Sequence, residues 1–154
     1  MSMTVGFIGL GVMGGPMAQH LSEQYTTLVY DVDASRTEGF PADRRAAGIA
    51  ELAAASDLVL MSLPRTDIVE SVVLGEDGVL ASLDAGKTVI DLSTTNPGVT
   101  RRIADELAKK GIGFLDAPVS GGEKGAKAAS LAIMVGGDEE LFERYREVLD
   151  VVGG

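Results

Sequence analysis

Apolar runs alternate with amphipathic stretches along the chain. Short runs of aliphatic and β-branched residues predict strands, and apolar positions at helical spacing predict helices. The predicted strands are residues 5–9, 26–31, 57–63, 87–93, 112–116 and 131–135, with a short edge strand near 45–47 in the polar stretch 34–48. The predicted helices are residues 12–24, 49–55, 68–74, 97–110 and 138–149, and residues 121–129 form a glycine-rich, lysine-containing connection.

The order of these elements predicts the fold class. Residues 57–63 (DLVLMSL) are mostly apolar and stop at Pro64, as central strands of parallel sheets do. Alternating strands and helices then give an α/β fold of Rossmann type, a doubly wound and mostly parallel sheet with helices on both faces. We expect residues 1–154 to form one domain, because neither a linker nor an internal repeat interrupts the pattern.

Composition narrows the classes of partner. The chain is 45% hydrophobic and 23% charged, which is typical of globular proteins. Its net charge of −10 repels phosphate backbones and anionic membrane surfaces, so we expect neither nucleic acid nor membrane as a partner. With no Cys and one His, the common zinc sites and thiol nucleophiles are excluded; we expect no metal site and a cytoplasmic protein.

The uncharged N-terminal segment belongs to the fold. The first charged residue is Glu23, but no basic region precedes the apolar run, and several glycines interrupt it. We therefore expect neither a signal peptide nor a membrane anchor here. The 20 glycines cluster at particular turns, which indicates backbone packed close to a ligand.

The first turn between a strand and a helix carries the strongest chemical signal. It reads Gly9-x-Gly11-x-x-Gly14, a spacing that is informative between a strand and a helix. In this pattern the first glycine permits the tight turn, the second lets the backbone approach a pyrophosphate, and the third lets helix and strand pack closely. The single domain is therefore expected to bind a dinucleotide; a glycine-rich turn without a ligand is the alternative.

An acid at the end of the second strand indicates which dinucleotide binds. Asp31 lies 22 positions after Gly9, where a carboxylate accepts hydrogen bonds from the ribose hydroxyls. This position favours NAD, because a 2′-phosphate would meet charge repulsion. Arg36 is the nearby base that could soften that repulsion, and Asp33 is the weaker substitute for Asp31.

Two motifs far apart in the sequence resemble one family. Residues 7–18 (FIGLGVMGGPMA) resemble the N-terminal signature of the β-hydroxyacid dehydrogenases, the family of 3-hydroxyisobutyrate dehydrogenase and tartronate semialdehyde reductase. Residues 116–126 (DAPVSGGEKGA) resemble the substrate-binding segment of that family. Spacing alone leaves the second segment equally open to being a flexible glycine-rich loop.

The resemblance implies a set of site residues. Ser120, Gly121 and Gly122 would bind substrate, through one hydroxyl and several exposed N–H groups. Strand ends at 63–64 and 93–94 would pass along the cofactor, since ligands of open α/β sheets bind outside the carboxyl ends of the strands. The expected cofactor-binding residues are Gly9, Leu10, Gly11, Val12, Met13, Gly14, Asp31, Leu63, Pro64 and Thr94.

The family's catalytic lysine is not in this chain. In the family it follows the dinucleotide domain, in a G-x-x-G-x-G-x-x-x-K-x-x-x-N pattern, so we name no catalytic residue here. The resemblance implies the NAD-binding part of an enzyme that moves hydride between NAD and a small 3-hydroxy carboxylate, homo-oligomeric in its full-length form. Residues 151–154 (VVGG) are expected to lead into a further domain. The alternative hypothesis is a dinucleotide-binding module without catalysis.

Overall fold

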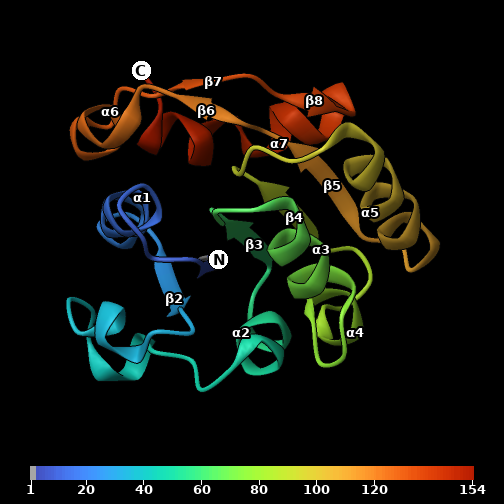
Figure 1. Cartoon of the computed structure of the whole chain (residues 1–154), viewed down its shortest axis with the longest axis horizontal. Helices are drawn as coiled ribbons and strands as arrows, with labels where there is room; N and C mark the ends of the chain where they lie inside the picture. Colours follow the sequence, from blue (N-terminus) through green and yellow to red (C-terminus); the bar gives the residue numbers. More distant parts are fainter. Residues whose placement is uncertain (1–2) are drawn as a thin grey trace.

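A six-stranded sheet forms the centre of the computed structural model, which describes residues 3–154 (Figure 1). Its strands are β1 (Thr4–Ile8), β2 (Thr26–Tyr30), β3 (Leu58–Met61), β4 (Thr88–Asp91), β5 (Gly113–Asp116) and β8 (Gly136–Gly137). The helices are α1 (Gly14–Ser22), α2 (Ile49–Ala55), α3 (Thr66–Leu74), α4 (Val79–Ser82), α5 (Pro97–Lys109), α6 (Gly122–Ala128) and α7 (Glu139–Val152). Two short 3₁₀ helices, Ala34–Thr37 and Ala42–Arg44, follow β2.

The strand order confirms the predicted fold class. It is β2-β1-β3-β4-β5-β8, with β1 to β5 parallel and β8 antiparallel to β5. From β1 the chain proceeds to β2 on one side, and from β3 to β4 and β5 on the other. The order thus reverses between β1 and β3, and such a switch point is where open α/β sheets bind ligands.

Helices cover both faces of the sheet, as expected. On one face α1 and α7 bury Met17, Leu21 and Leu149 against Val5 and Phe7, with α6 beside α1 (Figure 1). The other face holds a second apolar core, contributed by α2, α3, α4 and α5 together with alternate strand residues. In the described chain no helix is both long and apolar enough to cross a membrane.

The expected connection at 121–129 is wrong, because most of it is helix α6. The sequence did not predict this helix, because glycine is unfavourable in helix interiors. Here Gly125 packs against Leu131, where a larger side chain would be crowded. The Lys127 ammonium also lies 2.8 Å from the Glu123 carboxylate one turn away, which supports the helix.

The strand predicted at residues 131–135 is shorter in the structure, where it is β7 (Ala132–Ile133). It pairs antiparallel with β6 (Val119–Ser120) in a small separate sheet. The chain then returns to the main sheet as β8, two glycines without side chains to signal a strand. Gly137 has a φ of 137°, a conformation that favours glycine and helps to turn the chain there.

Other boundaries differ by a few residues. The edge strand at 45–47 reduces to a single bridge between Val29 and Arg45. The first helix starts at Gly14 rather than 12, because residues 11–13 form the turn. The last helix continues through Val152, so two of the four residues expected to lead onward belong to α7.

Candidate functional site

The glycines of the first turn divide into two that serve packing and one that faces open space. Gly9 has a φ of 97°, and a Cβ there would collide with the Ser62 carbonyl oxygen. A Cβ at Gly14 would collide with the Gly9 carbonyl oxygen, so only glycine lets α1 pack this close to β1. A Cβ at Gly11 would meet only the Arg36 guanidinium, at 3.7 Å. Gly11 is therefore where a ligand can approach the backbone.

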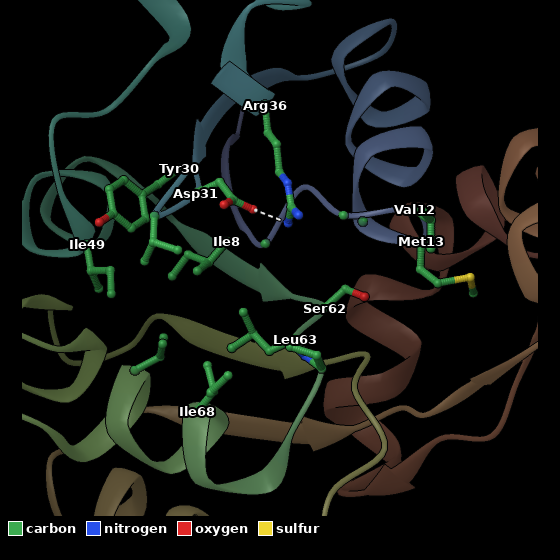
Figure 2. Close-up of a pocket in the computed structure, with 16 residues that line it drawn as sticks. Ile8, Val12, Met13, Tyr30, Asp31, Arg36, Ile49, Ser62, Leu63 and Ile68 are labelled. Atoms are coloured by element: carbon green, nitrogen blue, oxygen red, sulfur yellow. Dashed lines mark ion pairs between the residues drawn. The ribbon is translucent and has the colours of Figure 1, made fainter. Parts of the chain in front are cut away.

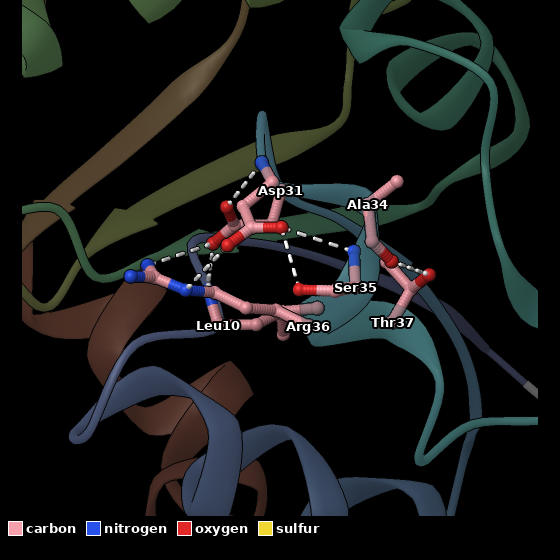
Figure 3. A network of polar contacts seen from close by, with 7 residues as sticks. Leu10, Asp31, Ala34, Ser35, Arg36 and Thr37 are labelled. Carbon is pink, nitrogen blue, oxygen red and sulfur yellow. Dashed lines mark hydrogen bonds and ion pairs between the residues drawn. The ribbon is translucent and has the colours of Figure 1, made fainter.

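Asp31 ties the end of β2 to this turn (Figure 3). Its Oδ2 accepts a hydrogen bond from the Leu10 N–H at 2.7 Å, and its Oδ1 accepts one from the Asp33 N–H at 2.8 Å. The residue is only 9% exposed. The carboxylate is held in one orientation, with its negative charge at the edge of the turn.

Arg36 lies between the two acids that follow β2. Its Nη1 is 3.6 Å from Asp31 Oδ2, and its Nε is 3.7 Å from Asp33 Oδ2. Hydrogen bonds from the Ser35 hydroxyl and N–H lower the pKa of the Asp33 carboxyl, and Arg36 adds to this. Half of the Arg36 side chain is exposed, so its ion pairs are weak and it can move when a ligand binds.

The turn and Asp31 open onto a cavity of ≈ 290 Å³ at the switch point (Figure 2). Its walls are mostly apolar: Tyr30 and Ile49 lie on one side, Ile68 and Leu63 lie on the other, and Val72 also lines it. Two residues at its mouth are unusually exposed for aliphatic side chains, Val12 at 67% and Val32 at 90%. An apolar slot with one fixed carboxylate at its edge can take a flat ring joined to a hydroxylated group.

Most of the expected cofactor residues line this cavity. They are Gly9, Gly11, Val12, Met13, Gly14, Asp31, Leu63 and Pro64. Leu10 lies behind the turn, where its side chain is buried and its N–H orients Asp31. Thr94 is exposed beyond the end of β4 and does not contribute to the cavity wall.

Sequence reasoning did not single out the apolar walls. The apolar residues are Ile8, Tyr30, Val32, Ile49, Ile68 and Val72, and the polar residues Ser62 and Arg36 line the cavity as well. Ile68 and Val72 are one helical turn apart in a helix that was predicted, but such a pair looks the same whether it faces a core or a ligand. The feature of the sequence that could have identified the cavity walls is that several of these residues follow strands that end at the switch point.

A network of hydrogen bonds shapes the ends of β3 and β4. Asp91 is fully buried; its Oδ1 accepts the Ser93 N–H at 2.9 Å, and its Oδ2 accepts the Thr95 hydroxyl at 2.7 Å. The Ser93 hydroxyl in turn accepts the Leu63 N–H at 2.8 Å. Burial raises the pKa of the Asp91 carboxyl, although its hydrogen bonds act in the opposite direction. This network fixes the backbone that precedes Thr94.

Asp116 stands beside Asp91 at the end of β5. The two residues are register partners in adjacent parallel strands. Burial, and then the charge of Asp91, raise the pKa of the Asp116 carboxyl, and its Oδ1 is buried without a hydrogen-bond partner. Ionisation of the Asp116 carboxyl is therefore disfavoured both by burial and by the neighbouring charge of Asp91.

The expected substrate segment follows immediately. Ser120 ends β6, and Gly121 and Gly122 lead into α6 with φ values of 137° and 61°. All three are exposed, and none lines the cavity described above. The segment therefore forms a separate glycine-rich surface at the start of α6, the helix that contacts α1.

The residues present fit a dinucleotide. The turn offers backbone without a side chain at Gly11, Asp31 offers fixed acceptor oxygens, and the cavity onto which both open has apolar walls. These three parts correspond to a pyrophosphate, a ribose and an adenine ring in the order that a dinucleotide presents them.

Comparisons with known proteins agree with this geometry. Residues 4–154 match the family model described as the NAD-binding domain of 6-phosphogluconate dehydrogenase. The chain is 44% identical to 2-(hydroxymethyl)glutarate dehydrogenase of Eubacterium barkeri, over 99% of this chain and 52% of the relative. It is 40% identical to 2-hydroxy-3-oxopropionate reductase of Escherichia coli, over 98% of this chain and 52% of that protein.

A solved structure extends the likeness to the fold. 3-Hydroxyisobutyrate dehydrogenase of Mycobacterium tuberculosis with L-serine aligns with a TM-score of 0.91 and 36% identity, over 100% of this chain and 53% of that one. The chain thus spans about half the length of the relatives it matches. The resemblance to the β-hydroxyacid dehydrogenases is confirmed, and the chain belongs to the NAD-binding domain family of 6-phosphogluconate dehydrogenase and these enzymes.

Proposed function

We propose that this chain is the cofactor-binding part of an NAD-dependent dehydrogenase that acts on a small 3-hydroxy carboxylate. The observation that carries the proposal is the continuous path from Gly11 past Asp31 into the apolar cavity. The relatives named above are dehydrogenases or reductases of small hydroxy acids, which supports the reaction class.

In the proposed complex each part of the site has one task. The N–H groups around Gly11 bind the pyrophosphate, since a turn that opens a helix presents unpaired donors to an anion. Asp31 accepts hydrogen bonds from the adenosine ribose hydroxyls. Ile49, Ile68 and Val72 surround the adenine ring. The strand ends at 63–64 and 93–94 border the remainder of the cofactor, as the carboxyl ends of strands do in open α/β sheets.

Ser120, Gly121 and Gly122 are the proposed substrate contacts. Their exposure leaves the Ser120 hydroxyl and the glycine N–H groups free to donate to a carboxylate or accept from a hydroxyl. They lie on the carboxyl side of β5, the edge of the sheet at which the cavity also opens. Substrate and cofactor would therefore meet along one edge.

NAD, when bound, supplies a hydride acceptor for the carbon that bears the hydroxyl. The residues of this chain position both partners, but they do not supply an evident base for the hydroxyl proton. In the family a lysine that follows this domain would take that proton. Finding that lysine pattern downstream in the parent reading frame would separate the enzyme from a dinucleotide-binding module without catalysis.

A Gly11→Val substitution tests the site directly. The branched side chain would project into the space proposed for the pyrophosphate, yet the structure leaves room for it, so the fold should survive. We expect the wild-type chain to gain about 2.7 kcal/mol of stability at a free NAD concentration of a hundred Kd, and the variant to gain none. Thermal shift with NAD and circular dichroism measure the two effects.

Gly48→Val is the matched control. Gly48 has extended backbone, has no neighbour within 4 Å of a Cβ, and lies outside the cavity wall. Its valine variant should respond to NAD as the wild type does. A folded Gly11→Val chain that is still stabilised by NAD would overturn the assignment of this turn.

A further inference from the structure

The single histidine connects two helices that are far apart in the sequence. His20 lies in α1, and its Nε2 is 3.2 Å from the Ala126 carbonyl oxygen and 2.9 Å from that of Lys127. Both carbonyls belong to α6, the helix that follows the glycine-rich segment at 120–122. From the sequence His20 reads as a surface or boundary residue, and it is partly exposed, but the pattern gave no sign of this contact.

The two acceptors fix which ring nitrogen carries a proton. Carbonyl oxygens only accept hydrogen bonds, so Nε2 must be the donor. The neutral tautomer with the proton on Nε2 and the imidazolium both provide it. The contact is therefore a shared hydrogen bond from α1 to the last turn of α6, where the Ala126 carbonyl oxygen also accepts the Ala129 N–H at 3.3 Å.

α6 is a short unit with a turn at each end. Gly121 caps its start and Gly122 is its first residue, both with positive φ values, and Ala129 ends it in the left-handed conformation, with φ 55° and ψ 41°. One face, Gly125 and Ala126, is buried, while most of the helix is exposed. A seven-residue helix is too short to be stable by itself, so contacts with its neighbours decide where it sits.

α1 is the neighbour that also carries the proposed cofactor site. It begins at Gly14, directly after the phosphate turn, and Figure 1 shows α6 lying beside it. The Ser120–Gly122 segment lies at the other end of α6, and Ser120 is also paired with Ala132 in the β6–β7 sheet. The His20 bond thus connects the helix that follows the phosphate turn with the helix that follows this segment.

We propose that His20 is a positioning residue that couples order in the cofactor turn to order in the segment proposed to bind substrate. The proposal rests on the proposed function for the identity of the two ligands, and on the His20 contacts for the coupling. It assigns a role to a side chain that touches neither ligand.

Hydrogen exchange of the 154-residue chain, with and without NAD, tests the coupling. In the wild type, NAD should slow exchange in residues 9–14 and also in 122–130. In His20→Ala, residues 122–130 should exchange about fivefold faster without NAD, the factor that one hydrogen bond of ordinary net strength supplies. In that variant NAD should protect only the turn. His20→Gln, whose amide nitrogen reaches about as far as Nε2, should restore both effects.

Gln19→Ala is the matched control on the same helix. The Gln19 amide donates to the Gly39 carbonyl oxygen at 3.1 Å, a side-chain bond of the same kind to a different segment. Its loss should leave the exchange of residues 122–130 unchanged. A thermal melt of each variant establishes that it is folded.

Two results would overturn the coupling. One is protection of residues 122–130 by NAD in His20→Ala as strong as in the wild type. The other is protection of the turn alone in the wild type. If NAD protects neither segment and calorimetry shows no binding, the proposed function fails instead, and the comparison of His20→Ala with Gln19→Ala without NAD still decides whether His20 holds α6.

Discussion

Asp31 is the residue whose charge should decide between the two nicotinamide dinucleotides. Its carboxylate is buried and oriented by the Leu10 and Asp33 N–H groups, so a 2′-phosphate cannot avoid it. We expect NAD to bind more tightly than NADP, and Asp31→Asn to narrow that preference roughly tenfold by removing the repulsion. Calorimetric titration with both cofactors measures it. A melting curve checks the fold, because asparagine keeps only one of the two acceptor oxygens.

Arg36→Ala is the counterpart of that substitution. The guanidinium lies 3.6 Å from Asp31 and partly offsets its charge. Its removal should weaken NADP binding more than NAD binding and so widen the preference. Equal or tighter binding of NADP by the unmodified chain would mean that Arg36, rather than Asp31, controls the site.

Among the elements, β4 and β5 end on a pair of acids with a predictable effect on stability. Asp91 and Asp116 both have pKa values raised above the usual 3.8. A raised pKa means that the folded protein keeps the carboxyl proton to a higher pH than the unfolded chain does. The stability that the protonated carboxyl allows is fully present below pH 3.8 and is lost as the pH rises through the pKa of the folded state. Asp116→Asn, which stays neutral, should therefore melt higher than the wild type at pH values above that window.

The advantage of Asp116→Asn should vanish at a pH below the usual aspartate range. Asp105→Asn, on the exposed side of α5, controls for the loss of one negative charge from a chain of net charge −10. Thermal melts over a pH series test both variants. An Asp116→Asn chain that melts below the wild type throughout would show that the ionised carboxylate stabilises the strand ends.

The elements also show where sequence patterns stop being informative. Strands β1, β3 and β4 were predictable because each is a run of buried residues, which few other structures require. Strand β2 is only partly buried and was predictable from its β-branched and aromatic residues. Helix α6 and strand β8 were not, because glycine carries no periodicity. Their structure depends on partners, Leu131 for α6 and β5 for β8, that lie elsewhere in the chain.

The candidate site divides in the same way. The glycine turn and Asp31 were predictable, because a tight backbone approach and a strand-end acid need specific residue types at a fixed spacing. The cavity walls were not, since an aliphatic side chain such as Val72 packs equally well on a core or a ligand. The role proposed for His20 also depends on contacts made across more than a hundred residues, at Ala126 and Lys127.

For the molecule as a whole, binding and turnover should separate. Every dinucleotide contact proposed here, from Gly9 to Thr94, lies within the 154 residues, so NAD binding should persist. Hydride transfer also requires a group to take the hydroxyl proton, which typically contributes 10²–10⁴-fold. In the proposed complex, the exposed Ser120–Gly122 segment would also leave the reacting carbon open to water. The missing proton acceptor and the open site should together lower the rate of hydride transfer by more than either does alone.

We therefore expect the chain to bind NAD without oxidising any hydroxy acid. The test follows NADH absorbance with 3-hydroxyisobutyrate, glycerate and related acids, at NAD concentrations that calorimetry has shown to be saturating. Binding without turnover is the expected result. Turnover by the chain alone at an ordinary dehydrogenase rate would mean that it contains its own base. Lys124 and Lys127, exposed on α6 beside the glycine-rich segment, would then be the first side chains to replace, because they are the lysines nearest Ser120 in the sequence.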